Sequence, residues 1–153
     1  MTEAANNQLM AGKRGLVLGI ANDHSIAYGI ARALHGAGAE LALTYQGEGF
    51  QKRVAPLAAS LDCDLLMPCD VTDGDSMDAL FSAIGEKWGG LDFLVHAIAY
   101  SDRAELSGRY VDTTRENFVQ TLSISCFSFT DLARRAAAMM PNGGSMVTLS
   151  FLG

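Results

Sequence analysis

The chain has 153 residues, enough for one domain and few for two. Apolar residues make up 49% and charged residues 18%, a composition that excludes a disordered chain. The formal net charge of −6 argues against nucleic acid as a partner, because phosphate backbones select basic surfaces. Apolar runs are far shorter than the roughly 18–20 residues of a membrane span. The polar, acidic start of the chain is wrong for a signal peptide, so we expect a cytoplasmic protein with no membrane partner.

Short apolar runs alternate with amphipathic helical patterns from Lys13 onward, which is typical of βαβ units and a parallel sheet. The expected elements, in chain order, are strand 15–18, helix 25–34, strand 40–45, helix 50–61, strand 64–69, helix 76–88, strand 91–98, polar loop 101–112, helix 113–140 and strand 145–149.

Two prolines and one capping pattern sharpen these expectations. Pro56 lies inside the second predicted helix and predicts a late start or a kink there. Pro68 lies in the third predicted strand and indicates an edge position in the sheet. The long last helix is predicted to begin at a capping box, Thr113-x-x-Glu116, and carries apolar residues at helical spacing up to Met140.

The number of strands suggests the fold and its extent. A doubly wound dinucleotide-binding fold has six strands in the order 3-2-1-4-5-6, and this sequence supplies five. We therefore predict an α/β fold with a doubly wound, Rossmann-like parallel sheet in which five strands are present and the C-terminal strands are missing. The fifth strand would then be an exposed, apolar edge.

The turn after the first strand has the features of a phosphate-binding turn. Gly19 can supply the tight turn, and Ser25 can cap the following helix and offer a hydroxyl to a phosphate. Gly29, one helical turn later, would let the helix pack close to the sheet. The G-x-G-x-x-G fingerprint is absent, so an ordinary capped turn is the alternative, but the strand and helix context favours cofactor binding.

The ends of the next three strands supply further candidate binding residues. Gln46 follows the second strand, where an acidic residue reads the ribose of NAD and an Arg the 2′-phosphate of NADP; an uncharged Gln favours NAD. Asp70 can accept from an adenine amino group or, alternatively, cap the next helix, and Val71 would form an apolar wall. Ile98 ends the fourth strand at the carboxyl edge, where open α/β sheets bind ligands.

Histidine and cysteine give weaker signals. His96 lies in an apolar strand and is expected to be a hydrogen-bonded core histidine, not a base. The odd number of cysteines, Cys63, Cys69 and Cys126, favours buried or half-buried thiols. No His, Cys or carboxylate set has metal-ligand spacing, so no metal site is predicted.

Five segments together resemble one family. They are Gly19-x5-Ser25-Ile-Ala-Tyr-Gly29, Gly38–Gln46, Cys69–Val71, Phe93–Ala99 and Thr148–Gly153. These segments resemble the bacterial NADH-dependent enoyl-acyl-carrier-protein reductases, a divergent branch of the short-chain dehydrogenase/reductase family, over nearly all of residues 10–153. The G-x5-S-I-A-x-G turn is specific, since most short-chain dehydrogenases carry T-G-x3-G-x-G there.

The resemblance implies an activity, a cofactor and partners. The activity is hydride transfer from NADH to a trans-2-enoyl thioester of acyl carrier protein, a step of fatty acid biosynthesis, in a full-length protein that is a homotetramer. Matching motifs imply dinucleotide contacts by Gly19, Ser25, Ile26, Gln46, Asp70, Val71 and Ile98. Ser101 would lie near the acyl substrate, although the family more often has Ala there.

Two departures from the family bear on activity. Phe151 stands where the family usually has a tyrosine, and Phe cannot donate a proton. The family's catalytic tyrosine and lysine follow the segment matched by residues 150–153, so we assign no catalytic residue here and expect this chain alone to be inactive. We interpret residues 1–12 as a polar N-terminal tail and 13–153 as an incomplete dinucleotide-binding domain. The alternatives are a non-catalytic dinucleotide-binding module or another short-chain reductase.

Overall fold

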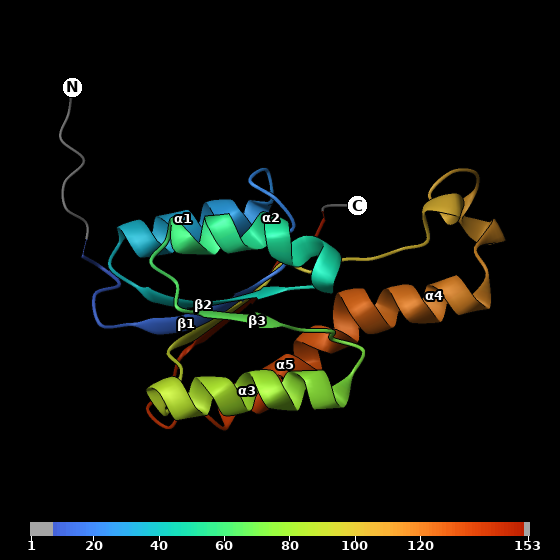
Figure 1. The fold of residues 1–153 in the computed structure, drawn as a ribbon. Helices are drawn as coiled ribbons and strands as arrows, with labels where there is room; N and C mark the ends of the chain where they lie inside the picture. Colours follow the sequence, from blue (N-terminus) through green and yellow to red (C-terminus); the bar gives the residue numbers. More distant parts are fainter. Residues whose placement is uncertain (1–7, 152–153) are drawn as a thin grey trace.

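The computed structural model describes residues 8–151, in which helices cover both faces of a five-stranded parallel sheet (Figure 1). The elements are β1 (Arg14–Leu18), α1 (Ile26–Gly36), β2 (Glu40–Tyr45), α2 (Glu48–Ala59), β3 (Leu65–Pro68), α3 (Gly74–Trp88), β4 (Phe93–His96), η1 (Arg103–Glu105), η2 (Tyr110–Asp112), α4 (Arg115–Leu122), η3 (Ser123–Phe127), α5 (Ser128–Ala137) and β5 (Ser145–Thr148). The strand order β3-β2-β1-β4-β5, parallel throughout, confirms the doubly wound sheet.

The core lies in two layers, one on each face of the sheet. In β1, Leu16 and Leu18 pack with buried residues of α3 and α5, whereas Val17 packs with those of α1 and α2. Successive strand residues point to opposite faces, and both faces are covered by helices. This explains why the strands read as continuous apolar runs and do not alternate with polar residues.

The two edges of the sheet are formed by β3 and β5. Pro68 pairs with Tyr45 in the edge strand β3, as the proline predicted. In the described part of the chain β5 pairs only with β4, and most of its residues are exposed. The expectation of an exposed fifth strand is therefore confirmed for these residues.

The late start expected for the second helix and the close packing expected at Gly29 are wrong. The second helix begins at Glu48, earlier than expected, and continues through Pro56. Proline has no backbone N–H, so one carbonyl of the preceding helical turn lacks its usual donor. Pro56 is exposed, so this carbonyl can bond water instead. Gly29 is also exposed, and a Cβ built on it would meet no atom within 4 Å. Close packing against the sheet is therefore not the reason for this glycine.

The long helix begins one residue later than predicted and contains a π-helical turn. The side chain of Thr114, not Thr113, accepts from the Asn117 N–H. Glu105, from the turn η1, accepts from the N–H and the hydroxyl of Thr114 at 3.0 and 2.6 Å. A distant carboxylate thus does what Glu116 was expected to do, which the local sequence pattern does not reveal.

Only the second half of this long helix covers the sheet. Leu132 and Ala136 of α5 are fully buried, whereas Phe118 and Leu122 of α4 are 44% and 47% exposed. Figure 1 shows α4 extending past the end of the sheet. The π-helical turn η3 lies at the junction, where the buried face ends.

The predicted tail is described only in part, since residues 1–7 lie outside the described residues. Met10 donates its backbone N–H to the Ala37 carbonyl and packs against the α1 and α2 side of the core. No helix in the described residues is long and apolar enough to cross a membrane.

Candidate functional site

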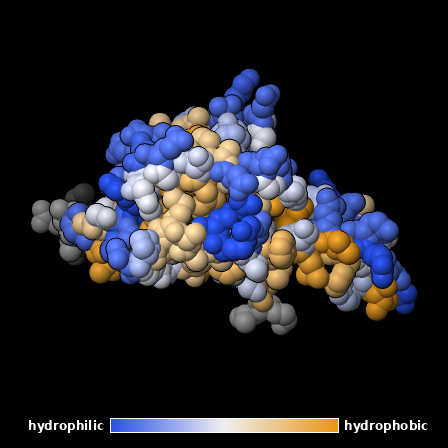
Figure 2. Space-filling view, turned by 90° about the horizontal axis from the view of Figure 1, so that it is seen from below, coloured by the Kyte–Doolittle hydropathy of each residue, from blue (hydrophilic) through white to orange (hydrophobic). Residues whose placement is uncertain are grey.

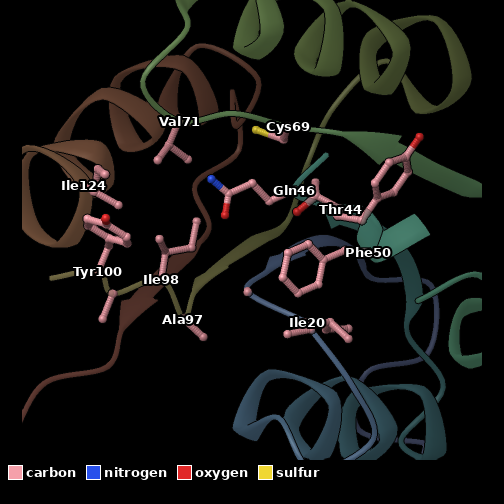
Figure 3. A pocket seen from close by; sticks show the side chains of 14 residues that line it. Ile20, Thr44, Gln46, Phe50, Cys69, Val71, Ala97, Ile98, Tyr100 and Ile124 are labelled. Atoms are coloured by element: carbon pink, nitrogen blue, oxygen red, sulfur yellow. The ribbon is translucent and has the colours of Figure 1, made fainter. Parts of the chain in front are cut away.

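A pocket lies at the carboxyl ends of β1, β2, β3 and β4, beside η3 (Figure 3). Its lining residues are Gly19, Ile20, Ala21, Thr44, Tyr45, Gln46, Phe50, Cys69, Val71, Ala97, Ile98, Ala99, Tyr100 and Ile124. None of these carries a charged side chain. The position is the one where open, doubly wound sheets bind ligands, at the switch between the two directions of strand order.

Gly19 is required by the backbone of the first turn. Its φ is +110°, in a region that side-chain-bearing residues rarely adopt. A Cβ built there would overlap the carbonyl oxygen of Ala97. The chain after β1 therefore touches the chain after β4, and we call this contact the pocket floor. The predicted role of Gly19 as the residue of the tight turn is supported by both observations.

The Ser25 side chain bonds the loop before it and not the helix after it. It occupies the N-cap position of α1, yet its hydroxyl makes no bond to the helix. Instead, Ser25 Oγ accepts from the backbone N–H groups of Ala21 and Asn22, at 3.0 and 3.1 Å. The expected side-chain cap is therefore wrong, and the hydroxyl stabilises the loop that carries Ala21. Neither Ser25 nor Ile26, which is 69% exposed, lines the pocket.

Gln46 and Phe50 form the β2 side of the pocket. Figure 3 shows the Gln46 amide reaching toward the middle of the pocket, with Phe50 beside it. The guanidinium carbon of Arg53 lies 5.9 Å from the centre of the Phe50 ring. The Arg53 guanidinium therefore makes a cation–π contact with this ring, and Arg53 is not among the lining residues of the pocket.

Val71 lines the pocket at the end of β3, whereas Asp70 does not. Asp70 Oδ1 accepts from the N–H and the hydroxyl of Thr72, at 2.9 and 2.7 Å. The cap of α3 is Asp73, whose Oδ1 accepts from the Asp75 N–H at 3.0 Å. Asp70 therefore does not cap this helix, and one of its oxygens closes the local turn.

The opposite wall consists of Ile98, Tyr100 and Ile124 (Figure 3). Ile98 was predicted to lie there, but Tyr100 and Ile124 were not predicted as dinucleotide contacts. Tyr100 lies four residues after the end of β4, so its place near a strand end was a usable signal. Ile124 lies in the π-helical turn η3, and no sequence pattern predicts where such a turn forms.

Ser101 follows Tyr100 in the chain and does not line the pocket. It shares a polar cluster with Asn117 and Thr121 of α4, with atoms 3.2–3.4 Å apart. The nearly buried Asn117 also accepts from the Asp102 N–H at 2.8 Å. These bonds fix the start of the loop after β4 against α4.

The thiols differ in exposure and in acidity. Cys69 is buried in the pocket wall; burial first, and then the negative charge of Asp70, raises its pKa to about 11. Burial also raises the pKa of half-buried Cys63. Cys126 is exposed on η3, so the expectation of a buried or half-buried thiol is wrong there. All three are free.

His96 is a fully buried core histidine, as predicted. Its Nδ1 lies 2.7 Å from Thr148 Oγ1 and its Nε2 lies 2.8 Å from Ser128 Oγ. Ser128 donates its own hydroxyl to the Ile124 carbonyl at 2.6 Å, so it accepts from Nε2–H. Burial lowers the pKa of His96, which favours this neutral form.

The site suits a ligand that has flat apolar groups, hydroxyl groups and an anionic group that accepts hydrogen bonds from backbone N–H groups. Apolar walls face each other across the pocket, and Gln46 offers an uncharged donor and acceptor. An anion would depend on backbone N–H groups and on the positive end of α1, because no lining residue is basic. Within the described residues no cluster of His, Cys, Asp or Glu could hold a metal ion.

Comparisons with known proteins agree with this geometry. Residues 19–153 match the family model described as enoyl-(acyl carrier protein) reductase. Enoyl-(acyl-carrier-protein) reductase (NADH) 2 of Rhizobium meliloti strain 1021 is 60% identical over 147 residues, which are 96% of this chain and 55% of that protein. The corresponding enzyme of Rickettsia bellii is 50% identical over 145 residues, 95% of this chain and 55% of that protein.

Solved structures are similar over the same part. The reductase of Anaplasma phagocytophilum in complex with NAD has a TM-score of 0.92 and 54% identity, covering 95% of this chain and 55% of that one. The Bacillus cereus enzyme with NADP+ and indole naphthyridinone has a TM-score of 0.91 and 43% identity, covering 95% and 57%. The chain thus spans about half the length of the relatives that it matches.

Proposed function

Because the chain belongs to the enoyl-(acyl carrier protein) reductase family, we propose that its pocket binds NADH for the reduction of trans-2-enoyl-acyl-carrier-protein. The observation that carries this proposal is an uncharged pocket at the carboxyl edge of the sheet, entered by the Gly19 turn. Bound NADH supplies the hydride for that reduction. The residues of this chain hold and orient the dinucleotide.

We assign a part of the dinucleotide to each side of the pocket. Gln46 bonds ribose hydroxyls and Val71 packs against the adenine, with the outer oxygen of Asp70 accepting from its amino group. The backbone after Gly19 and the start of α1, at Ser25 and Ile26, meet the pyrophosphate. Ile98 contacts the half that extends toward β4, and Ser101 supports the acyl-binding side from behind Tyr100.

The same pocket favours NADH over NADPH. A 2′-phosphate beside Gln46 would be partly desolvated with no cation among the lining residues, and Arg53 is already packed on Phe50. An unpaired charge in such a place is costly. The Bacillus cereus structure contains NADP+, so the test below compares both nucleotides.

Fluorescence titration of the 153-residue chain with each nucleotide tests the binding proposal. We expect saturable NADH binding and at least tenfold weaker NADPH binding. A Gln46→Arg variant should narrow that difference, with Gln51→Arg, in the same helix region, as a control for added charge. Equal binding of both nucleotides by the unmodified chain would refute the preference, and no NADH binding would refute the assignment of the pocket.

We expect no turnover by this polypeptide alone. By family resemblance, the catalytic tyrosine and lysine follow the segment matched by residues 150–153, and the chain does not supply them. An assay of NADH oxidation with a crotonyl thioester tests this directly. Turnover above the rate without protein would refute this proposal.

The exposed apolar residues of α4 and η3 are our candidate for a subunit contact in the homotetramer that we propose for the full-length protein. Val119 and Phe127 are each 60% exposed, and Leu122 is 47% exposed. Figure 2 shows hydrophobic side chains gathered at the α4 end of the molecule. Light scattering should detect self-association that Phe127→Asp abolishes and that the exposed polar change Gln120→Asn leaves intact. The proposed partner is acyl carrier protein, to which the enoyl substrate is bound as a thioester.

A further inference from the structure

Ser125 joins two segments that are distant in the sequence. Its hydroxyl accepts from the Tyr100 N–H at 2.9 Å and donates to the Tyr100 carbonyl at 3.1 Å. One side chain therefore satisfies both backbone groups of a residue that lies outside any strand or helix. A hydroxyl can do this because it is both donor and acceptor.

The residues on either side of this contact belong to the pocket. Tyr100 lines the wall directly, and Ile124, next to Ser125 in η3, lines it as well. The Tyr100 side chain is 45% exposed, so side-chain packing holds it only in part. Its backbone bonds to Ser125 therefore set where it lies relative to Ile124.

The Ile124 side of the wall is itself anchored to the core. The π-helical turn η3 interrupts the regular bonding of the helix, as such turns do. The Ser128 hydroxyl bonds the Ile124 carbonyl at 2.6 Å, and His96 of β4 holds Ser128 in turn. Ser128 and His96 are buried. Ile124 is thus fixed to the sheet, and Ser125 ties Tyr100 to that fixed point.

We propose that Ser125 is a positioning residue that sets the Tyr100–Ile124 wall and, through it, the affinity of the pocket for NADH. The inference rests on the proposed function, because it takes NADH as the ligand. It goes further by assigning a role to a side chain that does not line the pocket. Ser125 contacts the wall and acts on the ligand only through it.

The test compares Ser125→Ala with Ser125→Thr, which keeps the hydroxyl. Cys126→Ala is the matched control, because Cys126 is exposed in the same turn. We expect Ser125→Ala to raise the Kd for NADH about five- to tenfold, the effect of losing a wall held by two hydrogen bonds. Ser125→Thr should stay within about twofold of the unmodified chain, and Cys126→Ala should not change the Kd.

Two further measurements separate positioning from folding and from the proposed function. Thermal unfolding of Ser125→Ala should shift by less than about 4 °C, because half-exposed Tyr100 backbone groups can bond water instead. Amide hydrogen exchange at Tyr100 should be about tenfold faster in Ser125→Ala. An unchanged Kd, or an equal loss in Cys126→Ala, would overturn the inference. If the unmodified chain binds no NADH, the proposed function fails. The inference is then tested separately by amide exchange, and unchanged exchange at Tyr100 in Ser125→Ala would overturn it.

Discussion

Gly19→Ala is the substitution that tests most sharply how the pocket floor is built. Two independent features oppose a side chain at this position. The φ of +110° is unfavourable for every residue except the achiral glycine. The added Cβ would also overlap the Ala97 carbonyl oxygen. The overlap involves backbone, so no side-chain rotation can relieve it.

The cost can be estimated by separating these two features. A side chain in the positive-φ region costs about 1–3 kcal/mol. Relief of the overlap requires the ends of β1 and β4 to move apart, which breaks the 3.1 Å bond from the Ala97 N–H to the Leu18 carbonyl. That bond contributes about 1 kcal/mol net, and leaving its buried partners unpaired costs about 1–3 kcal/mol more. The total of about 3–7 kcal/mol is a large part of the roughly 5–15 kcal/mol stability of a domain.

Two other glycines provide matched controls in urea unfolding experiments. Gly47 has a φ of +72° and a ψ of 162° but open space around a built Cβ, so Gly47→Ala should cost only the conformational part, about 1–3 kcal/mol. Gly29 lies inside α1 with open space and no positive φ, so Gly29→Ala should stabilise by about 0.5–1 kcal/mol. If Gly19→Ala costs no more than Gly47→Ala, the close approach of β1 and β4 is not what requires glycine.

Three further predictions concern side chains away from the pocket floor. Burial lowers the pKa of His96 below 6.5, so as the pH falls below 6.5 the unfolded chain takes up a proton before the folded chain does. The free energy of unfolding should therefore have its full value above pH 6.5 and fall as the pH drops below 6.5. Thermal unfolding at pH 7.5 and 5.5 should show this loss, and His96→Gln should reduce it; an equal loss in that variant would exclude His96 as its source. Iodoacetamide at pH 7.5 should label Cys126 first and Cys69 last, because Cys69 is buried with a pKa of about 11; mass spectrometry of the folded chain decides, and early labelling of Cys69 would contradict its burial. Glu105→Ala should accelerate amide exchange at Thr114 while leaving α5 protected, because its carboxylate caps only the start of α4; unchanged exchange would show that Thr114 holds the helix start without it.

The β2 and β3 side of the site could be predicted from the sequence because its residues follow strand ends. Gly19 and Gln46 each come directly after a strand and Val71 comes three residues after β3, and the topology of a parallel sheet brings such positions to one edge. The sheet itself follows from the alternation of short apolar runs with helical patterns. Asp70 also follows a strand end, but one of its carboxylate oxygens bonds Thr72 in the local turn, and Asp70 does not line the pocket.

The opposite wall could not be predicted because it depends on contacts between distant segments. The cap of α4 uses Glu105 from nine residues before Thr114, so a search for a local capping box selects Thr113 instead. Ile124, which lines the pocket, lies in the π-helical turn η3. A regular helical wheel over residues 113–140 therefore assigns the wrong face to its first half.

His96 shows how a residue correctly assigned to the core also bears on the pocket. Its two ring nitrogens bond Thr148 of β5 and Ser128 of α5, and Ser128 bonds the Ile124 carbonyl. The edge strand β5 is therefore connected through three hydrogen bonds to the pocket wall. Edge strands with one neighbour open more readily than central strands, and opening of β5 removes the partner of His96 Nδ1. A segment that pairs with the side of β5 that is unpaired within the described residues should therefore also hold the wall at Ile124 in place.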